Sequence, residues 1–121
     1  MKLAVVGSRE GISKEYVFSV LDEYKGEISM VVSGGARGVD SFAAEWCDLN
    51  EVACTLVSPS DFSSKFSYIE RNWRIVDLSD KVLVFWDGVS RGTKSVIDYC
   101  KKKDKDISLF VFAKKGDDVG N

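Results

Sequence analysis

The fold is decided by the stretch Val31-Val32-Ser33-Gly34-Gly35-Ala36-Arg37-Gly38-Val39-Asp40, in which an apolar strand runs into a glycine-rich turn and then a helix. Glycine permits a tight turn, and it lets a ligand approach the main chain closely. The first N–H groups of a helix, together with its dipole, favour an anion. Arg37 adds a planar charged group suited to phosphate. The stretch therefore predicts a strand–turn–helix unit that holds a phosphorylated small molecule.

Strand-like and helix-like segments alternate on both sides of this unit. We expect strands over 2–6, 29–33, 52–58, 81–86 and 107–113, and helices over 14–24, 39–50, 67–78 and 93–102. Short strands that are apolar on both faces and separated by helices indicate a parallel sheet covered on both sides. The predicted fold class is a Rossmann-like three-layer α/β sandwich with a five-stranded parallel sheet in the order 3-2-1-4-5. Such sheets bind ligands where the strand order reverses.

Composition sets the expected domain, compartment and partners. The chain has 121 residues, of which 45% are hydrophobic, and this suits one domain over 1–113 followed by a polar tail over 114–121. The formal net charge of −2 lacks the broad basic surface typical of nucleic-acid binding, so we do not expect nucleic acid as a partner. The apolar runs are too short for a membrane span or a signal peptide, which predicts a cytoplasmic protein without a membrane partner.

The residue types exclude several kinds of chemistry. Histidine is absent, which excludes Ser-His-Asp and Cys-His catalysis and histidine-ligated zinc. Cys47, Cys54 and Cys100 form no CxxC pair, and we expect them to be small buried apolar side chains. We therefore expect no metal and no cofactor.

Three turns are expected to meet at the carboxyl edge of the sheet, because they follow the first, second and fourth strands. Each turn contains glycine, a hydroxyl group and an arginine. Two further residues on the third helix are expected to project over the same pocket. The candidate ligand- and phosphate-binding residues are Gly7, Ser8, Arg9, Ser33, Gly34, Gly35, Arg37, Gly38, Asp40, Arg71, Asn72, Asp87, Ser90, Gly92 and Thr93.

Some of these residues have a structural alternative. Asp40 caps its own helix or accepts a sugar hydroxyl. Asp87 is expected as an exposed carboxylate at the crevice, with capping as the alternative. Arg9 and Arg91 contact the ligand or are ordinary surface charges. Residues 88–95 are similar to the phosphate-loop pattern GxxxxGK[ST], but Thr93 stands at the second glycine, so we do not expect a nucleotide triphosphatase.

Four blocks of sequence together carry a resemblance to a known family. They are Gly7-Ser8-Arg9, residues 31–40, Arg71-Asn72 and residues 85–93. Their order and spacing resemble the SLOG superfamily, and within it the YspA-type, cpYpsA-related branch. The resemblance implies a Rossmann-like pocket for a nucleotide or a nucleotide-derived ligand, such as a signalling molecule, and it implies homo-oligomers. It extends more distantly to the LOG phosphoribohydrolases and to DNA-processing protein A.

We therefore expect a binding protein rather than an enzyme, with a nucleotide-type phosphorylated ligand at the carboxyl edge of the sheet. Two alternatives stay open. An N-glycoside hydrolase acting on a nucleoside monophosphate needs a catalytic carboxylate, for which Asp87 is a weak candidate together with Arg71. The LOG enzymes carry a glutamate at the position of Val96, and its loss puts hydrolysis in doubt. The other alternative is a module that binds single-stranded nucleic acid.

Overall fold

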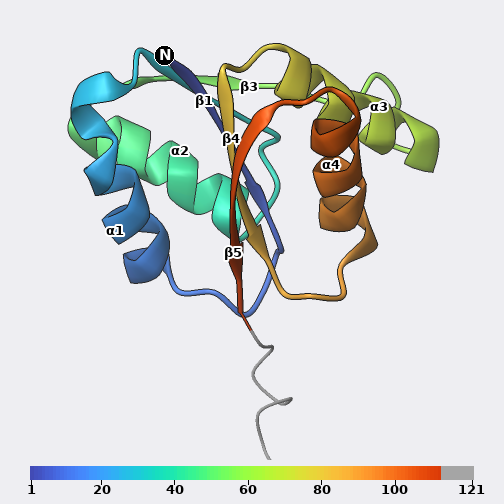
Figure 1. The fold of residues 1–121 in the computed structure, drawn as a ribbon, viewed down its shortest axis with the longest axis horizontal. Coiled ribbons are helices and arrows are strands. Elements are labelled where there is room, and N and C mark those ends of the chain that lie inside the picture. Colours follow the sequence, from blue (N-terminus) through green and yellow to red (C-terminus); the bar gives the residue numbers. More distant parts are fainter. Residues whose placement is uncertain (113–121) are drawn as a thin grey trace, which may run out of the picture.

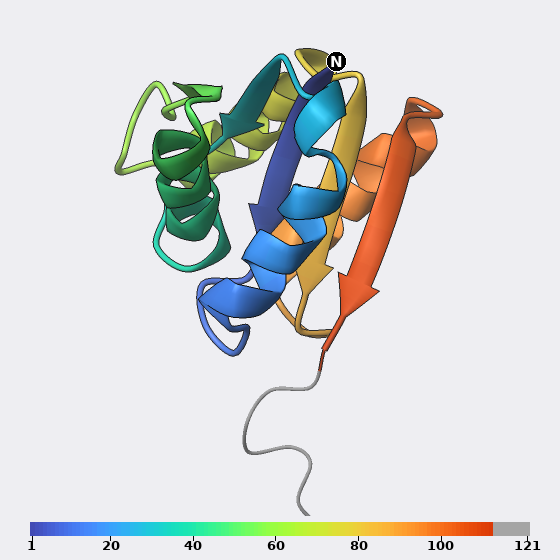
Figure 2. The same ribbon diagram turned by 90° about the vertical axis from the view of Figure 1, so that its left-hand side faces the viewer.

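A computed structural model describes residues 1–112, and within them five strands form one parallel sheet (Figures 1 and 2). The strand order β3-β2-β1-β4-β5 confirms the predicted order and the predicted Rossmann-like fold class. The strands are β1 (Lys2–Gly7), β2 (Met30–Ser33), β3 (Ala53–Leu56), β4 (Lys81–Trp86) and β5 (Asp106–Val111).

Helices cover both faces of this sheet. As Figure 1 shows, α1 and α2 lie on one side, and α3 and α4 lie on the other. The helices are α1 (Lys14–Glu23), α2 (Val39–Asn50), α3 (Lys65–Asp77) and α4 (Arg91–Lys102), with a short 3₁₀ helix, η1 (Lys25–Glu27), after α1. No helix of the described residues is long and apolar enough to cross a membrane.

The core is divided into two layers by the alternation of side chains along the strands. On β1, Leu3 and Val5 pack with α1 and α2, whereas Ala4 and Val6 pack with α3 and α4. All four side chains are buried. Burial on both faces explains why the central strands β1, β2 and β4 are apolar over consecutive positions instead of at alternate positions.

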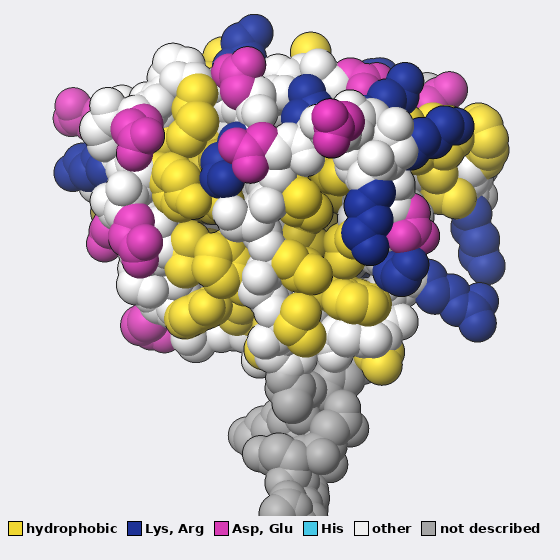
Figure 3. Space-filling model, viewed as in Figure 1, with side chains coloured by type: hydrophobic (Ala, Val, Ile, Leu, Met, Phe, Trp, Pro, Cys, Tyr) yellow, Lys and Arg dark blue, Asp and Glu magenta, His cyan; other side chains and the backbone are white. Residues whose placement is uncertain are grey.

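The two edge strands, β3 and β5, are less completely buried than the three central strands. Tyr16, Leu109 and Val111 remain exposed on or beside β5. Figure 3 shows hydrophobic side chains on this face of the molecule, over α1 and β5. Phe110 lies on the α1 side of the sheet, where it contacts the Tyr16 ring edge-on and stacks on Phe85, with ring centroids 4.9 Å apart.

Most boundaries agree with the predicted ones, and the differences have local causes. The Ser13 hydroxyl accepts a hydrogen bond from the Tyr16 N–H and so begins α1, as predicted. The third helix begins two residues early because Ser64 caps it. The third strand ends at Leu56, before the predicted 58, and the next carbonyl, that of Val57, accepts a hydrogen bond from Arg71. The predicted end of the fifth strand at 113 and the tail over 114–121 lie outside the described residues.

Candidate functional site

A pocket of about 370 Å³ opens at the carboxyl ends of the central strands. It lies where the strand order reverses between β1 and β4, which is where parallel α/β sheets bind their ligands. The turns after β1, β2 and β4 form its walls together with α3 and the start of α4. Its volume lies within the range of small-molecule sites, roughly 300–1,000 Å³.

The structure brings most of the predicted site residues to this pocket. Those that line it are Gly7, Ser8, Arg9, Arg37, Asp40, Arg71, Asn72, Asp87, Ser90, Gly92 and Thr93. The residues that do not line it are Ser33, Gly34, Gly35 and Gly38, together with Arg91. From the second turn and the start of the helix that follows it, Ala36, Arg37 and Asp40 line the pocket, whereas the three glycines of that turn do not.

Two of these glycines are required because other parts of the protein pack against them. A Cβ atom at Gly38 would lie only 2.7 Å from the Cα and carbonyl carbon of Arg9, and its φ of +77° disfavours any other residue. A Cβ atom at Gly34 would lie 2.8 Å from the guanidinium of Arg71 and 2.9 Å from a carboxylate oxygen of Asp40. Close approach of the main chain is thus real, but the neighbour is the protein itself.

Ser8 joins the first turn to the turn after β4. Its N–H donates to the carbonyl of Phe85 over 2.9 Å, and its hydroxyl accepts a hydrogen bond from the N–H of Asp87 over 3.1 Å. The same hydroxyl lies 3.3 Å from that of Ser90. Ser8 is buried, so its hydroxyl fixes the position of one turn against the other.

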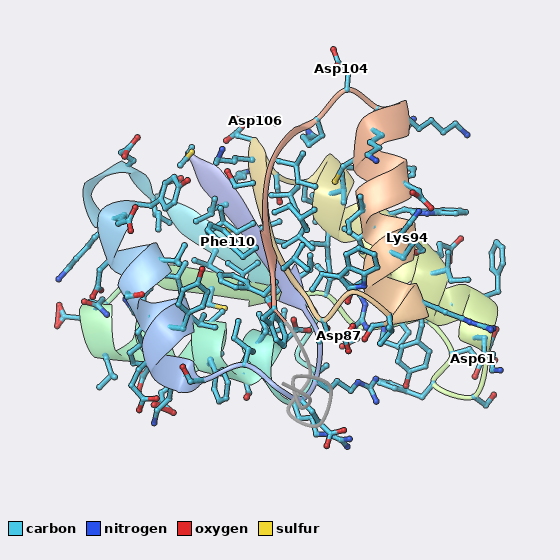
Figure 4. All side chains as sticks on the ribbon, turned by 60° about the horizontal axis from the view of Figure 1, so that its bottom comes forward. Asp61, Asp87, Lys94, Asp104, Asp106 and Phe110 are labelled. Atoms are coloured by element: carbon cyan, nitrogen blue, oxygen red, sulfur yellow. The ribbon has the colours of Figure 1, made fainter. Side chains whose placement is uncertain are left out.

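The prediction that Asp87 is an exposed carboxylate is wrong, because the side chain is buried. One carboxylate oxygen accepts hydrogen bonds from the N–H groups of Val89 (2.9 Å) and Ser90 (2.7 Å), and the other accepts from the Ser90 hydroxyl (2.8 Å). Figure 4 shows Asp87 between the end of β4 and the start of α4. These bonds fit the capping alternative, since Asp87 holds the residue that precedes α4.

Asp40 and Arg71 are the buried charged residues in the wall of the pocket. One Asp40 oxygen accepts a hydrogen bond from the Ala36 N–H over 3.1 Å, so this carboxylate holds the second turn. Burial raises the pKa of Asp40 to about 6, although the Ala36 N–H and the Arg71 charge both act to lower it. Arg71 donates from Nη1 to the carbonyls of Gly34 (2.7 Å) and Val57 (3.2 Å), and burial lowers the pKa of its guanidinium.

The rim of the pocket carries exposed charged side chains. Arg9, Glu10 and Arg37 are exposed, and the side chain of Arg37 is 69% accessible to solvent. Arg37 lies 3.9 Å from Glu10, a distance that gives a weak ion pair at an exposed position. Arg9 enters no ion pair with the residues that the structure describes. The cation best placed to meet an anion at the rim is therefore Arg9 rather than Arg37.

Sequence reasoning missed several lining residues. Tyr68 lines the pocket, and its ring centre lies 5.4 Å from the Arg71 guanidinium carbon. Its position three residues before Arg71 on a helix was a usable signal, because residues at that spacing share a face. Glu10 and Ala36 contribute to the walls, and the core residues Val6, Ile75 and Val96 form an apolar floor. Within residues 1–112 no group of three or more acidic or cysteine side chains is arranged to hold a metal ion.

Comparison with known proteins supports the fold described above. A model of the YspA, cpYpsA-related SLOG family matches residues 1–62. The fold is similar to DNA processing protein A from Streptococcus pneumoniae, with a TM-score of 0.78 and 22% identity over 89% of this chain and 49% of that chain. It is also similar to DNA processing protein A from Helicobacter pylori, with a TM-score of 0.73 and 24% identity over 92% of this chain and 64% of that chain. No curated protein matches the sequence.

The chain spans about half to two thirds of the length of these solved proteins, and at such identities the similarity concerns the fold alone. It nevertheless corrects one prediction. The Helicobacter pylori protein has a single-stranded DNA binding mode, so the exclusion of nucleic acid as a partner from the net charge was wrong. Net charge averages over the whole surface, whereas a single strand is held locally by a basic groove and by base stacking.

Proposed function

Since this chain belongs to the YspA, cpYpsA-related SLOG family, we propose that its pocket binds a nucleotide or a nucleotide-derived phosphorylated ligand. The observation that carries the proposal is the composition of the pocket wall. An apolar floor, an aromatic ring, a helix start and an exposed arginine surround a volume of about 370 Å³. Such a wall combines what a base, a sugar and a phosphate each require.

The N-termini of α2 and α4 are the two candidate positions for the phosphate of the ligand. The first N–H groups of a helix have no partner within it, so they favour an anion. At the start of α2 the protein supplies its own anion, because Asp40 lies in the first turn of that helix. At α4 the first turn contains no acidic residue, and Gly92 and Thr93 line the pocket; the Asp87 carboxylate lies before this helix, where it accepts hydrogen bonds from Val89 and Ser90. We therefore place the phosphate at the start of α4, with Arg9 facing it from the rim.

The opposite wall suits the base. Tyr68 presents a partly buried ring, and Asn72 presents a side-chain amide whose oxygen accepts a hydrogen bond from Arg71 Nε over 3.0 Å. That bond fixes the amide so that its NH₂ group is the end left to donate to a ligand. A planar base would stack on the ring and accept a hydrogen bond from this group.

The test begins with the purified chain. Mass spectrometry of small molecules released by denaturation identifies any ligand that co-purifies, and calorimetric titration then compares nucleoside monophosphates with the nucleosides that lack phosphate. Arg9→Ala should weaken phosphate-ligand binding by about 1.5–3 kcal/mol, the value for a lost charge-assisted hydrogen bond. Lys102→Ala is the control, since Lys102 is also exposed but lies at the far end of α4, outside the pocket. Equal affinities for nucleoside and nucleotide, or equal effects of the two variants, would contradict the proposal.

A second candidate function is the binding of single-stranded nucleic acid, which the fold similarity to a protein with such a binding mode favours. The same pocket would then hold one nucleotide of a longer strand. Fluorescence anisotropy of a labelled oligonucleotide at low and at physiological salt tests this function. Displacement of the oligonucleotide by a mononucleotide would support a shared pocket, and an absence of binding at low salt would remove this candidate.

A further inference from the structure

The outward face of α3 carries apolar side chains that the described residues leave uncovered. Phe66 is 59% exposed and Ile69 is 36% exposed, and Phe62 just before the helix is 70% exposed. Phe66 and Ile69 share a helix face with Trp73, whose ring centre lies 6.1 Å from that of Phe66. A helix that covers a sheet normally presents charged and polar residues to solvent, so a contiguous apolar face indicates an interaction surface.

A groove of about 550 Å³ continues this face toward α4. Trp73 forms its wall and stacks on Tyr99 of α4, with ring centroids 5.5 Å apart and an angle of 20° between the planes. The Tyr99 hydroxyl donates to the carboxylate of Asp77 over 2.9 Å. The wall is thus a fixed aromatic surface of the kind found at the centre of protein interfaces.

Two opposite charges flank the groove. Glu70 and Arg74 are both exposed, and both line it. They are four residues apart, yet they are not among the ion pairs of residues 1–112, since Arg74 Nη2 instead donates to the carbonyl of Ser58 over 2.8 Å. The carboxylate of Glu70 and part of the Arg74 guanidinium are therefore available to charges on another molecule.

We propose that this face, made of Phe66, Ile69, Glu70, Trp73 and Arg74, binds a second copy of this chain through an antiparallel pairing of the two α3 helices. A two-fold axis that crosses α3 near its middle places each Glu70 opposite Arg74 of the second copy. The same operation brings the two apolar faces together. The pattern is self-complementary, because one helix supplies both members of a reciprocal pair, and this argues for a second copy rather than for a partner of uniform charge.

The experiment is a charge exchange that is followed by sedimentation equilibrium over a wide range of protein concentration. Glu70→Arg and Arg74→Glu, each alone, should weaken self-association by about tenfold or more, because each places like charges opposite one another twice in the dimer. The double variant E70R/R74E should associate as the wild type does. An equimolar mixture of the two single variants should form a mixed dimer, since one copy is then basic at both positions and the other is acidic at both.

Two controls protect this test. Asp98→Arg on α4 changes the charge of an exposed helix outside the groove and should leave association unchanged. Circular dichroism shows whether each variant keeps its fold, which matters because Arg74→Glu also removes the bond to Ser58. Recovery in the double variant cannot come from that bond, so it reports the pairing itself. A wild type that stays monomeric at the highest concentration, or single variants that associate normally, would overturn the proposal, as would a double variant that does not recover.

Discussion

Replacement of Gly38 by alanine should be among the most damaging small substitutions in this chain. The backbone at this residue has φ +77° and ψ −129°, a region that only glycine adopts at low cost, and forcing another residue into it costs about 1–3 kcal/mol. The added Cβ would also lie 2.7 Å from the Cα and carbonyl carbon of Arg9, which are backbone atoms that cannot rotate away. Overpacking of this kind costs a further 1–3 kcal/mol or so. We expect a total loss of about 2–6 kcal/mol in the free energy of unfolding.

Gly35 provides the matched control. It lies in the same turn with nearly the same φ, +76°, but a Cβ there would meet only the Leu56 side chain at 3.8 Å. Gly35→Ala should therefore cost only the backbone term, about 1–2 kcal/mol. Urea unfolding of both variants can be followed by tryptophan fluorescence, because Trp46 is fully buried in the core. Equal losses in the two variants would refute the reasoning, since they would show that the first turn moves aside at no cost.

Two further predictions concern the buried charged residues in the wall of the pocket. Because burial raises the pKa of Asp40 from 3.8 to about 6, the stability that this group contributes is complete below about pH 4 and is lost as the pH rises through 6, a change of about 3 kcal/mol in the free energy of unfolding. This pH dependence should be absent in Asp40→Asn, and urea unfolding of both proteins from about pH 4 to about pH 7 measures it. A difference in stability between the two proteins that does not change with pH would contradict the prediction. At about pH 8, Arg71→Met should cost about 3–5 kcal/mol, because the Asp40 carboxylate loses its positive neighbour and must either stay buried with its charge unpaired or take up a proton. The double variant with Asp40→Asn should regain most of that loss; no recovery in the same assay would mean that the bonds from Arg71 to Gly34 and Val57 carry the stability instead.

The architecture was predictable because the sequence repeats one simple signal. Valine-rich segments such as 82–86 are apolar at every position, and this pattern is typical of a parallel sheet with helices on both faces. The helix at Val39–Asn50 has its predicted limits, since Gly38 stands immediately before it and Glu51 ends it with a left-handed φ of 57°. The sequence also predicted that three turns meet at one edge of the sheet, because the carboxyl ends of parallel strands lie at the same edge.

The details of the site were less predictable, because they depend on contacts between residues far apart in the chain. The bond between Ser8 and Asp87 joins positions 79 residues apart, and strand spacing alone does not fix the register that creates it. A glycine in a turn indicates that another group packs closely against the main chain, but it does not identify that group. Gly38 therefore suggested a ligand, whereas the group that packs against it is the backbone of Arg9. Tyr68 was overlooked because an aromatic residue on an amphipathic helix is more often part of the core.

The exposed rim of the pocket has a consequence for how this family diversifies. Arg9, Glu10 and Arg37 extend into solvent from turns whose shape is set by other, buried groups. Their replacement should leave the scaffold intact while altering which molecules are retained. Under the proposed function, substitutions at these three positions should change ligand specificity with little loss of folding stability, whereas a change at Ser8 or Asp87 should disturb the two turns that these residues hold together.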